Sequence, residues 1–355
     1  MMACARQGGS LPAVALMMPA ADGPAQAKLL RAGLAGEQGG GIAGEMELNR
    51  DNTEPQAFPG SSVRHEGDAD SQEDGAITVG RPTRAEMDIA ASWADIEGWN
   101  VGLHDVELYH EYGTEGFLVA RQGGRPVGFI FSIFFPDKTA ACGVFIVEKN
   151  RRNGSIGRVL GRAVLKLHYG WNVATMAVAD KVHAYSTFGY QAAYPIKRYE
   201  GLASGRPAPA GPAQLVPLTS PTDLPLAAIA AYDRHCFPAD RTRLLRLWCS
   251  QPGTVTMAAM VDGVLAGYGV SRIGQQGCCI EPLFADNRAI AEQLLHGLLA
   301  QAPAGTPYII DIACNNPQAC AMVAAHGWKF RFATMRMYSR YIPAIDSWRV
   351  YGDFL

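Results

Sequence analysis

The sequence has no excess of positive charge and no long apolar run. Its 31 Lys and Arg residues are balanced by 33 Asp and Glu residues, for a formal net charge of −2. Proteins that bind nucleic acid normally present a basic surface, so we expect no nucleic-acid partner. No apolar run reaches the roughly 18 residues that span a bilayer, so we expect no membrane contact.

The cysteines and histidines also lack the spacings that disulfide frameworks and metal sites show. The eight cysteines contain no C-x-x-C pair, and most lie within apolar segments. This pattern is typical of reduced, buried thiols in a cytoplasmic protein. The eight histidines show no H-x-x-x-H or similar spacing. We therefore expect a cytoplasmic protein without a metal.

Residues 1–76 differ in composition from the rest of the chain. They are rich in Gly, Ala, Ser, Gln and acidic residues and have no sustained periodicity, which predicts a disordered N-terminal extension. The first 35 residues contain one acidic residue, Asp22, as a transit peptide would, but arginines are sparse. A targeting segment and a non-functional extension both stay open.

From Ile77 onward the sequence alternates between strand and helix patterns, with 48% apolar residues over the whole chain. Gly123-Gly124 predicts a hairpin turn between two apolar strands. In order, we expect a strand, two helices, the hairpin, a strand–turn–helix unit, a further strand and helix, and a closing strand, at 77–80, 84–94, 105–112, 117–135, 141–165, 173–180, 181–190 and up to about 199.

The same order of elements recurs after a linker rich in Pro, Gly and Ala at 201–212. A second hairpin places Gly267 where the first has Gly128, a spacing near 140 residues, and a final strand closes the second unit. Five matched elements indicate an internal duplication. We predict an α/β protein with mixed sheets, consisting of domains at 77–200 and 213–355.

The stretch from Ala141 to Leu165 carries the strongest chemical signal. A buried strand ends in a turn of basic, small and glycine residues, KNRRNGSIG, which leads into a helix. Unpaired N–H groups and the positive end of the helix dipole make such a turn an anion site suited to a pyrophosphate. Gly154 and Gly157 allow close approach, and Arg151 and Arg152 add positive charge. The alternative is a plain strand–turn–helix connection.

Taken together, these motifs resemble the GCN5-related N-acetyltransferase (GNAT) superfamily in tandem form, in particular two-domain members of the holothin-acetyltransferase type. The resemblance covers about residues 77–355. It rests on EGWN followed by Asp105, RRNGSIGRVL, and YSTFGY followed by RYEG in the first half, and on YDRHCFPADR, EPLFADN and RMY in the second.

The resemblance implies a twisted mixed sheet that splays open and holds acetyl-CoA as co-substrate in the wedge. The pantetheine would pair with the strand Val144–Val147, and a backbone N–H at Val147 would stabilise the oxyanion of the reaction. On this reading the cofactor residues are Phe145, Ile146, Val147, Arg152, Asn153, Gly154, Ser155, Ile156 and Gly157. Ser155 departs from the family's R-x-x-G-x-G pattern, and a positive φ there would strain the loop.

The resemblance further implies that Tyr185, four residues before Gly189, protonates the departing thiolate. It places Trp99 and Asn100 at the acceptor cleft. No general base stands out. The candidates are the carboxylates of Glu97, Asp105 and Glu148, and the alternative is a chain of water molecules.

The second half lacks the same equipment, because Asp286 stands in its turn and Val323 takes the place of Tyr185. We therefore expect a degenerate cofactor site there. The expected activity is acetyl transfer from acetyl-CoA to a small-molecule primary amine, and longer acyl donors stay open. A non-catalytic acyl-CoA-binding or regulatory module is the alternative, and a protein-lysine or N-terminal acetyltransferase is a third.

Overall fold

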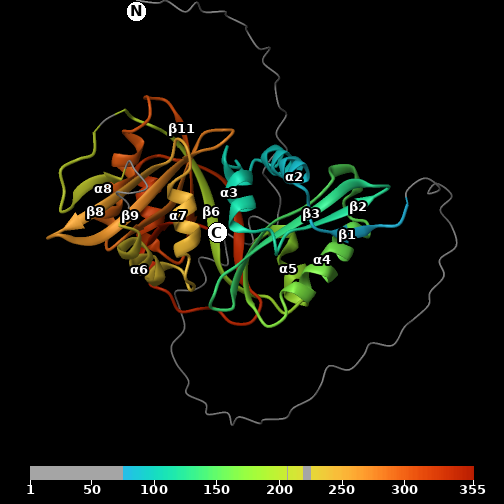
Figure 1. Ribbon diagram of the computed structural model, residues 1–355. Helices are drawn as coiled ribbons and strands as arrows, with labels where there is room; N and C mark the ends of the chain where they lie inside the picture. Colours follow the sequence, from blue (N-terminus) through green and yellow to red (C-terminus); the bar gives the residue numbers. More distant parts are fainter. Residues whose placement is uncertain (1–74, 206, 219–224) are drawn as a thin grey trace, which may run out of the picture.

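The computed structural model describes residues 75–355 except for 206 and 219–224 (Figure 1). The disordered extension predicted for 1–76 therefore lies outside the described residues apart from Gly75 and Ala76, as does residue 206 of the predicted linker. The described chain is mixed α/β, which confirms the predicted fold class.

The first half follows the predicted order of elements. Its strands and helices are β1 (Thr78–Gly80), α2 (Arg84–Ile96), α3 (Asp105–Tyr112), β2 (Leu118–Gln122), β3 (Arg125–Phe134), β4 (Thr139–Val147), η2 (Lys149–Arg151), α4 (Ile156–Leu167), β5 (Asn172–Val178), η3 (Ala179–Lys181), α5 (Val182–Thr187) and β6 (Gln191–Leu202).

The second half repeats this order. It comprises β7 (Gln214–Leu218), α6 (Leu226–Cys236), α7 (Thr242–Cys249), β8 (Val255–Val261), β9 (Val264–Ile273), β10 (Cys278–Ala285), α8 (Arg288–Leu299), β11 (Pro307–Ala313), α9 (Pro317–Ala325), β12 (Lys329–Tyr338), η4 (Ser347–Arg349) and β13 (Val350–Gly352).

Local chemistry accounts for where several elements begin and turn. Thr83 caps α2 with a capping box: its hydroxyl accepts from the Glu86 N–H, and the Glu86 carboxylate accepts from the Thr83 N–H at 2.7 Å. Gly123 and Gly124 have φ of 58° and 79°, as a tight hairpin turn requires. The start of α2 and the turn between β2 and β3 are therefore positions that a short sequence motif predicts.

The two halves share one thirteen-stranded sheet within the described residues, and they exchange their closing strands. The order is β1-β2-β3-β4-β5-β12-β6-β11-β10-β9-β8-β7, with β13 paired to β10. β12 pairs with β5 of the first half and β6 with β11 of the second, so neither strand closes its own half as the sequence order suggested. In the exchanged arrangement both strands are hydrogen-bonded on each side, which leaves no sheet edge between the halves.

The sheet of the first half splays open at the fork between β4 and β5. These parallel strands pair only from Thr139↔Asn172 to Cys142↔Thr175. Beyond Cys142, β4 bends away at an irregularity in its pairing with β3, where Val144 has a φ of 51°. The open side of β4 therefore faces a wedge.

The equivalent wedge of the second half contains a segment of the chain itself. β10 and β11 pair from Cys278↔Tyr308 to Ile280↔Ile310 and then diverge. Beyond that point β13 pairs with β10, with Leu283 opposite Gly352. The Asp353 N–H donates to the Asp311 carbonyl at 2.7 Å on the β11 side.

An apolar cluster joins both halves. It combines Phe117 and Phe135 of the first half with Leu245, Trp248 and Phe354 of the second. Burial of this apolar area stabilises each half and also the association of the two halves.

His168 is a buried histidine that makes stability depend on pH. It is 6% exposed, its Nε2 lies 2.8 Å from the Ser132 hydroxyl, and its Nδ1 has no partner among the described residues. Burial lowers its pKa to about 4. Since the unfolded chain binds this proton more tightly, stability is lost as pH falls from the ordinary value near 6.5 toward about 4.

Between about pH 8 and about pH 5, His168 should account for a loss of roughly 2 kcal/mol of unfolding free energy. His168→Gln keeps a hydrogen-bonding group beside Ser132 but does not titrate, so urea unfolding at the two pH values should show a correspondingly smaller loss. The exposed His110→Gln is the control and should behave like wild type. Equal losses in the His168 variant and wild type would contradict this account.

Candidate functional site

Tyr185 lies on α5 beside the fork between β4 and β5. Its ring packs edge-on against Tyr190, with centroids 5.4 Å apart. Burial raises the pKa of Tyr185, the nearby Cys142 thiol raises it further, and a hydrogen bond with Thr175 lowers it. Cys142 and Thr175 form the last residue pair before β4 and β5 diverge. The protonated hydroxyl is therefore held at the fork, where it can donate a hydrogen bond.

The predicted cofactor strand, Phe145, Ile146 and Val147, forms the free side of the wedge. Ile146 is opposite Phe129 of β3, and the next bond along runs from the Glu148 N–H to the Val127 carbonyl at 3.0 Å. By the alternation of antiparallel pairing, the N–H and C=O of Val147 are directed away from β3. The N–H is available to an extended ligand in the wedge, whereas the carbonyl accepts from the Arg152 guanidinium at 3.0 Å.

The predicted pyrophosphate loop is exposed from Arg152 to Ser155. Asn153 takes the left-handed conformation, with a φ of 68°, which asparagine tolerates. Ser155 has a φ of −79° and is the N-cap of α4, so serine causes no strain at the position where the family pattern has glycine.

The start of α4 offers free N–H groups. The first intrahelical bond runs from the Val159 N–H to the Ser155 carbonyl at 3.0 Å, and within the described chain the Ser155 hydroxyl makes no capping bond. Ile156 and Gly157 therefore have no acceptor in a preceding helical turn. Because the first turn carries no acidic residue, the helix start suits an anion.

Two candidate general bases are engaged in ion pairs near this loop. Glu97 pairs with Arg152 at 2.6 Å, and Arg152 also donates to the Val147 carbonyl at 3.0 Å. Glu148 pairs with Arg151 at 3.0 Å and with Arg125 at 3.5 Å. Neither carboxylate lies in the cavity beside the fork.

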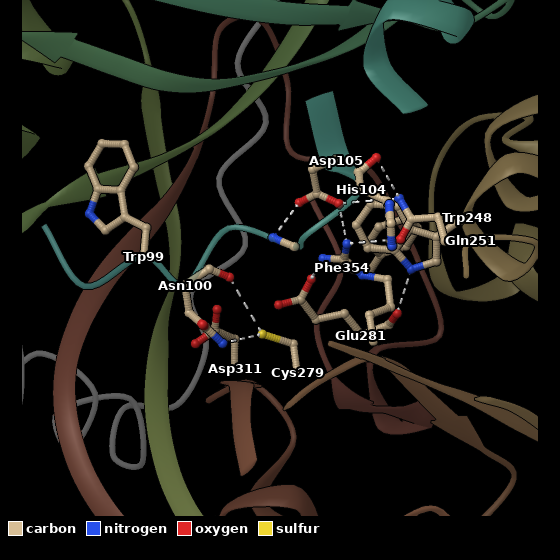
Figure 2. Close-up of polar contacts among 12 residues, drawn as sticks. Trp99, Asn100, His104, Asp105, Trp248, Gln251, Cys279, Glu281, Asp311 and Phe354 are labelled. Carbon is tan, nitrogen blue, oxygen red and sulfur yellow. Dashed lines mark hydrogen bonds and ion pairs between the residues drawn. The ribbon is translucent and has the colours of Figure 1, made fainter. Parts of the chain in front are cut away.

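Asp105, the third candidate, belongs to a buried charge network between the halves (Figure 2). It accepts from the Gly102 N–H at 2.9 Å and from the guanidinium of Arg272, which also pairs with Glu281 at 3.0 Å. Burial raises the pKa of Glu281. Asp105 also lines the cavity described below, whereas Glu97 and Glu148 do not.

Asn100 connects the two halves. Its amide donates to the Gly277 carbonyl and to the Cys279 sulfur, both at 3.0 Å, and accepts from the Gln276 N–H at 2.7 Å. Trp99 packs in an apolar cluster with β3 and β4, and Figure 2 shows its ring pointing away from the charge network. Both residues position the segment that leads to Asp105, while the cavity lining comes from their neighbours.

A cavity of about 150 Å³ lies at the fork, between the α2–α3 side of the sheet and the segment that ends at Leu355. Its walls are mostly apolar. Cys142 borders it and also interacts with Tyr185, which joins the cavity to the tyrosine hydroxyl. The lining residues are Met87, Ala91, Ala94, Val101, Asp105, Val106, Tyr109, Phe117, Phe131, Ile133, Ala141, Cys142, Gly143, Val144, Ala174, Met176, Arg336 and Leu355.

The site residues predicted from the sequence omit three residues of the cavity lining: Tyr109, Arg336 and Leu355. Tyr109 and Arg336 carry polar groups, and Arg336 and Leu355 belong to the second half. Arg336 is 3% exposed, pairs with Asp353, and has an Nε without a partner among the described residues. Burial and the nearby Asp105 raise the pKa of Tyr109. A buried arginine between Met335 and Met337 in a strand was a usable signal for Arg336; nothing in the sequence pointed to Leu355.

The corresponding turn of the second half presents a carboxylate, that of Asp286. Asp286 accepts from the Tyr232 hydroxyl at 2.8 Å and pairs with Arg349. Asn287 caps α8 by accepting from the Ile290 N–H at 3.1 Å. Val323, the counterpart of Tyr185, is buried in the apolar core.

The described chain contains no helix long and apolar enough to cross a membrane. It also contains no group of three or more His, Cys, Asp and Glu side chains arranged to hold a metal ion.

Comparison with known proteins agrees with this geometry. Residues 86–190 match the Acetyltransferase (GNAT) family model, and residues 229–352 match an Acetyltransferase (GNAT) domain model. A holothin acyltransferase from Pseudoalteromonas sp. (strain SANK 73390) is 25% identical over 255 residues, which cover 71% of this chain and 84% of that protein.

Two solved structures share the fold. A putative acetyltransferase from Pyrococcus horikoshii has a TM-score of 0.66 at 21% identity, covering 82% of this chain and 99% of that one. A tandem GNAT protein from the clavulanic acid biosynthesis pathway has a TM-score of 0.56 at 16% identity, covering 76% and 100%. The two matched ranges together span well over half of the sequence, and the chain belongs to the GNAT acyltransferases as a tandem protein with two GNAT domains.

Proposed function

We propose that this protein transfers an acetyl group from acetyl-CoA to a small-molecule primary amine, and that residues 77–200 carry the catalytic site. The observation that carries the proposal is the open wedge of the first half. It joins an exposed helix start, a strand with free backbone groups and an apolar cavity at one fork.

The residues of the first wedge fit an acyl-CoA. The free side of Phe145, Ile146 and Val147 suits the amides of the pantetheine, which pair as an added strand would. The loop from Arg152 to Gly157 suits the diphosphate, with N–H groups of the helix start as donors. When bound, acetyl-CoA supplies the thioester whose acyl group is transferred.

Tyr185 is proposed to donate a hydrogen bond to the sulfur as the thiolate departs. A free tyrosine with a pKa near 10 is already about 2 kcal/mol too weak an acid to protonate a thiolate of pKa near 8.5 completely. Burial raises the pKa of Tyr185 further. Stabilisation of the developing charge by a retained hydrogen bond is therefore the role that fits.

The cavity is proposed to hold the acceptor, with Asp105 as the group that binds its amine. A volume of about 150 Å³ is that of a site for one ring-sized molecule, since an engineered apolar cavity of roughly this size binds benzene. This size supports a compact amine. The name of the holothin acyltransferase relative supports a small-molecule acceptor as well.

The test is release of free thiol from acetyl-CoA in the presence of a panel of compact primary amines, run beside calorimetric titration with CoA. We expect one or more amines to stimulate release and CoA to bind. Binding of CoA without release by any amine would favour the alternative, a non-catalytic acyl-CoA-binding module. Glu97, Glu148 and Asp105 are all engaged in ion pairs, which favours that alternative because no candidate base is unpaired. Failure to bind CoA would overturn both.

Ser155→Asp should weaken CoA binding at least about tenfold, which corresponds to about 1.4 kcal/mol. The change places a carboxylate at the start of α4, as Asp286 does at the start of α8, where it would repel a diphosphate. Gln301→Glu adds the same charge at an exposed position of the second half and serves as control. Equal calorimetric affinities of the two variants would show that the diphosphate lies elsewhere.

A further inference from the structure

The second wedge is filled by residues Val350–Leu355, and the fit is close. Besides the pairing of β13 with β10, an added Cβ at Gly352 would lie 3.0 Å from both Ile310 and Leu283. The backbone groups of β10 and β11 that an extended ligand would use are therefore bonded to this segment.

A buried ion pair of the second half fixes the end of the segment. Arg241 pairs with Asp233 at 2.6 Å and donates to the Phe354 carbonyl at 2.9 Å. The Phe354 ring packs against Trp248, with centroids 4.2 Å apart, and the Arg241 guanidinium lies 4.3 Å from its centre. Contacts with Arg241 and Trp248 thus hold the end of the segment in place.

From this anchor the segment reaches the cavity of the first half. Leu355 forms part of the wall, and Asp353 pairs with Arg336, which also lines the cavity. Figure 1 shows the end of the chain at the junction of the two halves. An acceptor in the cavity would therefore contact a side chain whose position is determined by the other half.

We propose that the wedge of the second half is a docking site for the segment Val350–Leu355, and that the docked segment sets the size limit for the acceptor in the first half. The size limit for the acceptor rests on the proposed function, whereas the docking rests on the contacts of the segment alone. It follows that each chain binds one CoA, because the second wedge is occupied by protein. The second half then serves acceptor selection.

Size selection is tested by Leu355→Ala and Leu355→Phe, assayed with two primary amines that differ by a branched alkyl group. Leu355→Ala should shift the ratio of kcat/KM toward the larger amine about tenfold or more, and Leu355→Phe should shift it the other way. The KM for acetyl-CoA should not change. Leu202→Ala, at a leucine that is 63% exposed, is the matched control and should keep the wild-type ratio. An unchanged ratio in both Leu355 variants would overturn the proposed role.

Docking is tested without turnover, by hydrogen exchange and calorimetry. Amides of 350–354 should be protected in wild type and exchange at least about tenfold faster in Gly352→Val, whose side chain does not fit between Ile310 and Leu283. CoA should titrate to one site per chain in wild type. Unprotected amides in wild type, or two CoA sites per chain, would refute docking. If the amides of 350–354 are protected and one CoA binds per chain, but no amine stimulates thiol release, then only the proposed function is rejected.

Discussion

Tyr185→Phe is expected to lower kcat for acyl transfer by about 10²-fold or more, the usual contribution of a positioned hydrogen-bond donor to a developing negative charge. The variant loses only the hydroxyl at the fork, beside Cys142 and Thr175, and keeps the ring that packs on Tyr190. CoA affinity should change little, because β4 and α4 supply the contacts that we propose for the pantetheine and the diphosphate. Steady-state kinetics combined with calorimetry separate the two effects.

Tyr190→Phe is the matched control for this variant. It removes a hydroxyl from the other member of the same ring pair, where burial also raises the pKa of the tyrosine. Its kcat should stay close to that of wild type. If both variants lose activity equally, packing of the ring pair explains the effect. If neither loses activity, Tyr185 takes no part in the chemistry.

Arg241→Met is expected to destabilise the protein by about 3–5 kcal/mol, because it leaves the carboxylate of Asp233 buried and unpaired. The Arg241 and Asp233 side chains are 0% and 1% exposed, and the Tyr268 hydroxyl donates to the same carboxylate at 2.5 Å. The variant also removes the donor to the Phe354 carbonyl. Urea unfolding at neutral pH measures the loss.

The double variant Arg241→Met with Asp233→Leu should recover a large part of that stability, since no buried charge is then left unpaired. A double-mutant cycle therefore gives a coupling energy that the single variants cannot. A loss below about 1 kcal/mol in Arg241→Met alone, the range of exposed ion pairs, would contradict the buried pairing. The same loss in the single and double variants would place the effect on the Phe354 contact instead.

The fold within each half could be predicted from the sequence because local signals determine it. The Thr83 cap, the Gly123-Gly124 turn and the apolar runs each act within a few residues. The exchange of β6 and β12 could not, because both strands have similar lengths and close their units at equivalent places in the sequence order. Which pairing forms depends on the whole sheet, and no short motif records it.

The candidate site also contains residues that short motifs indicate and residues that only the folded chain brings together. The loop from Arg152 to Gly157 and Tyr185 belong to contiguous motifs, so the sequence can name them as candidates. Arg336 and Leu355 come from the far end of the chain and reach the cavity only through the exchanged strand and the filled wedge. The sequence around Asn100 likewise does not indicate that its amide donates to Gly277 and Cys279, which lie far along the chain.

The shared sheet limits how the two halves can move. β5 is joined to β12, and β6 to β11, by continuous ladders of backbone hydrogen bonds. Rigid-body separation of the two halves would have to break these ladders together. We therefore expect an acceptor to enter by displacement of loops or side chains around the cavity. Cutting the chain at the linker would leave each fragment with a strand that belongs in the other, and the two fragments should reassemble when mixed.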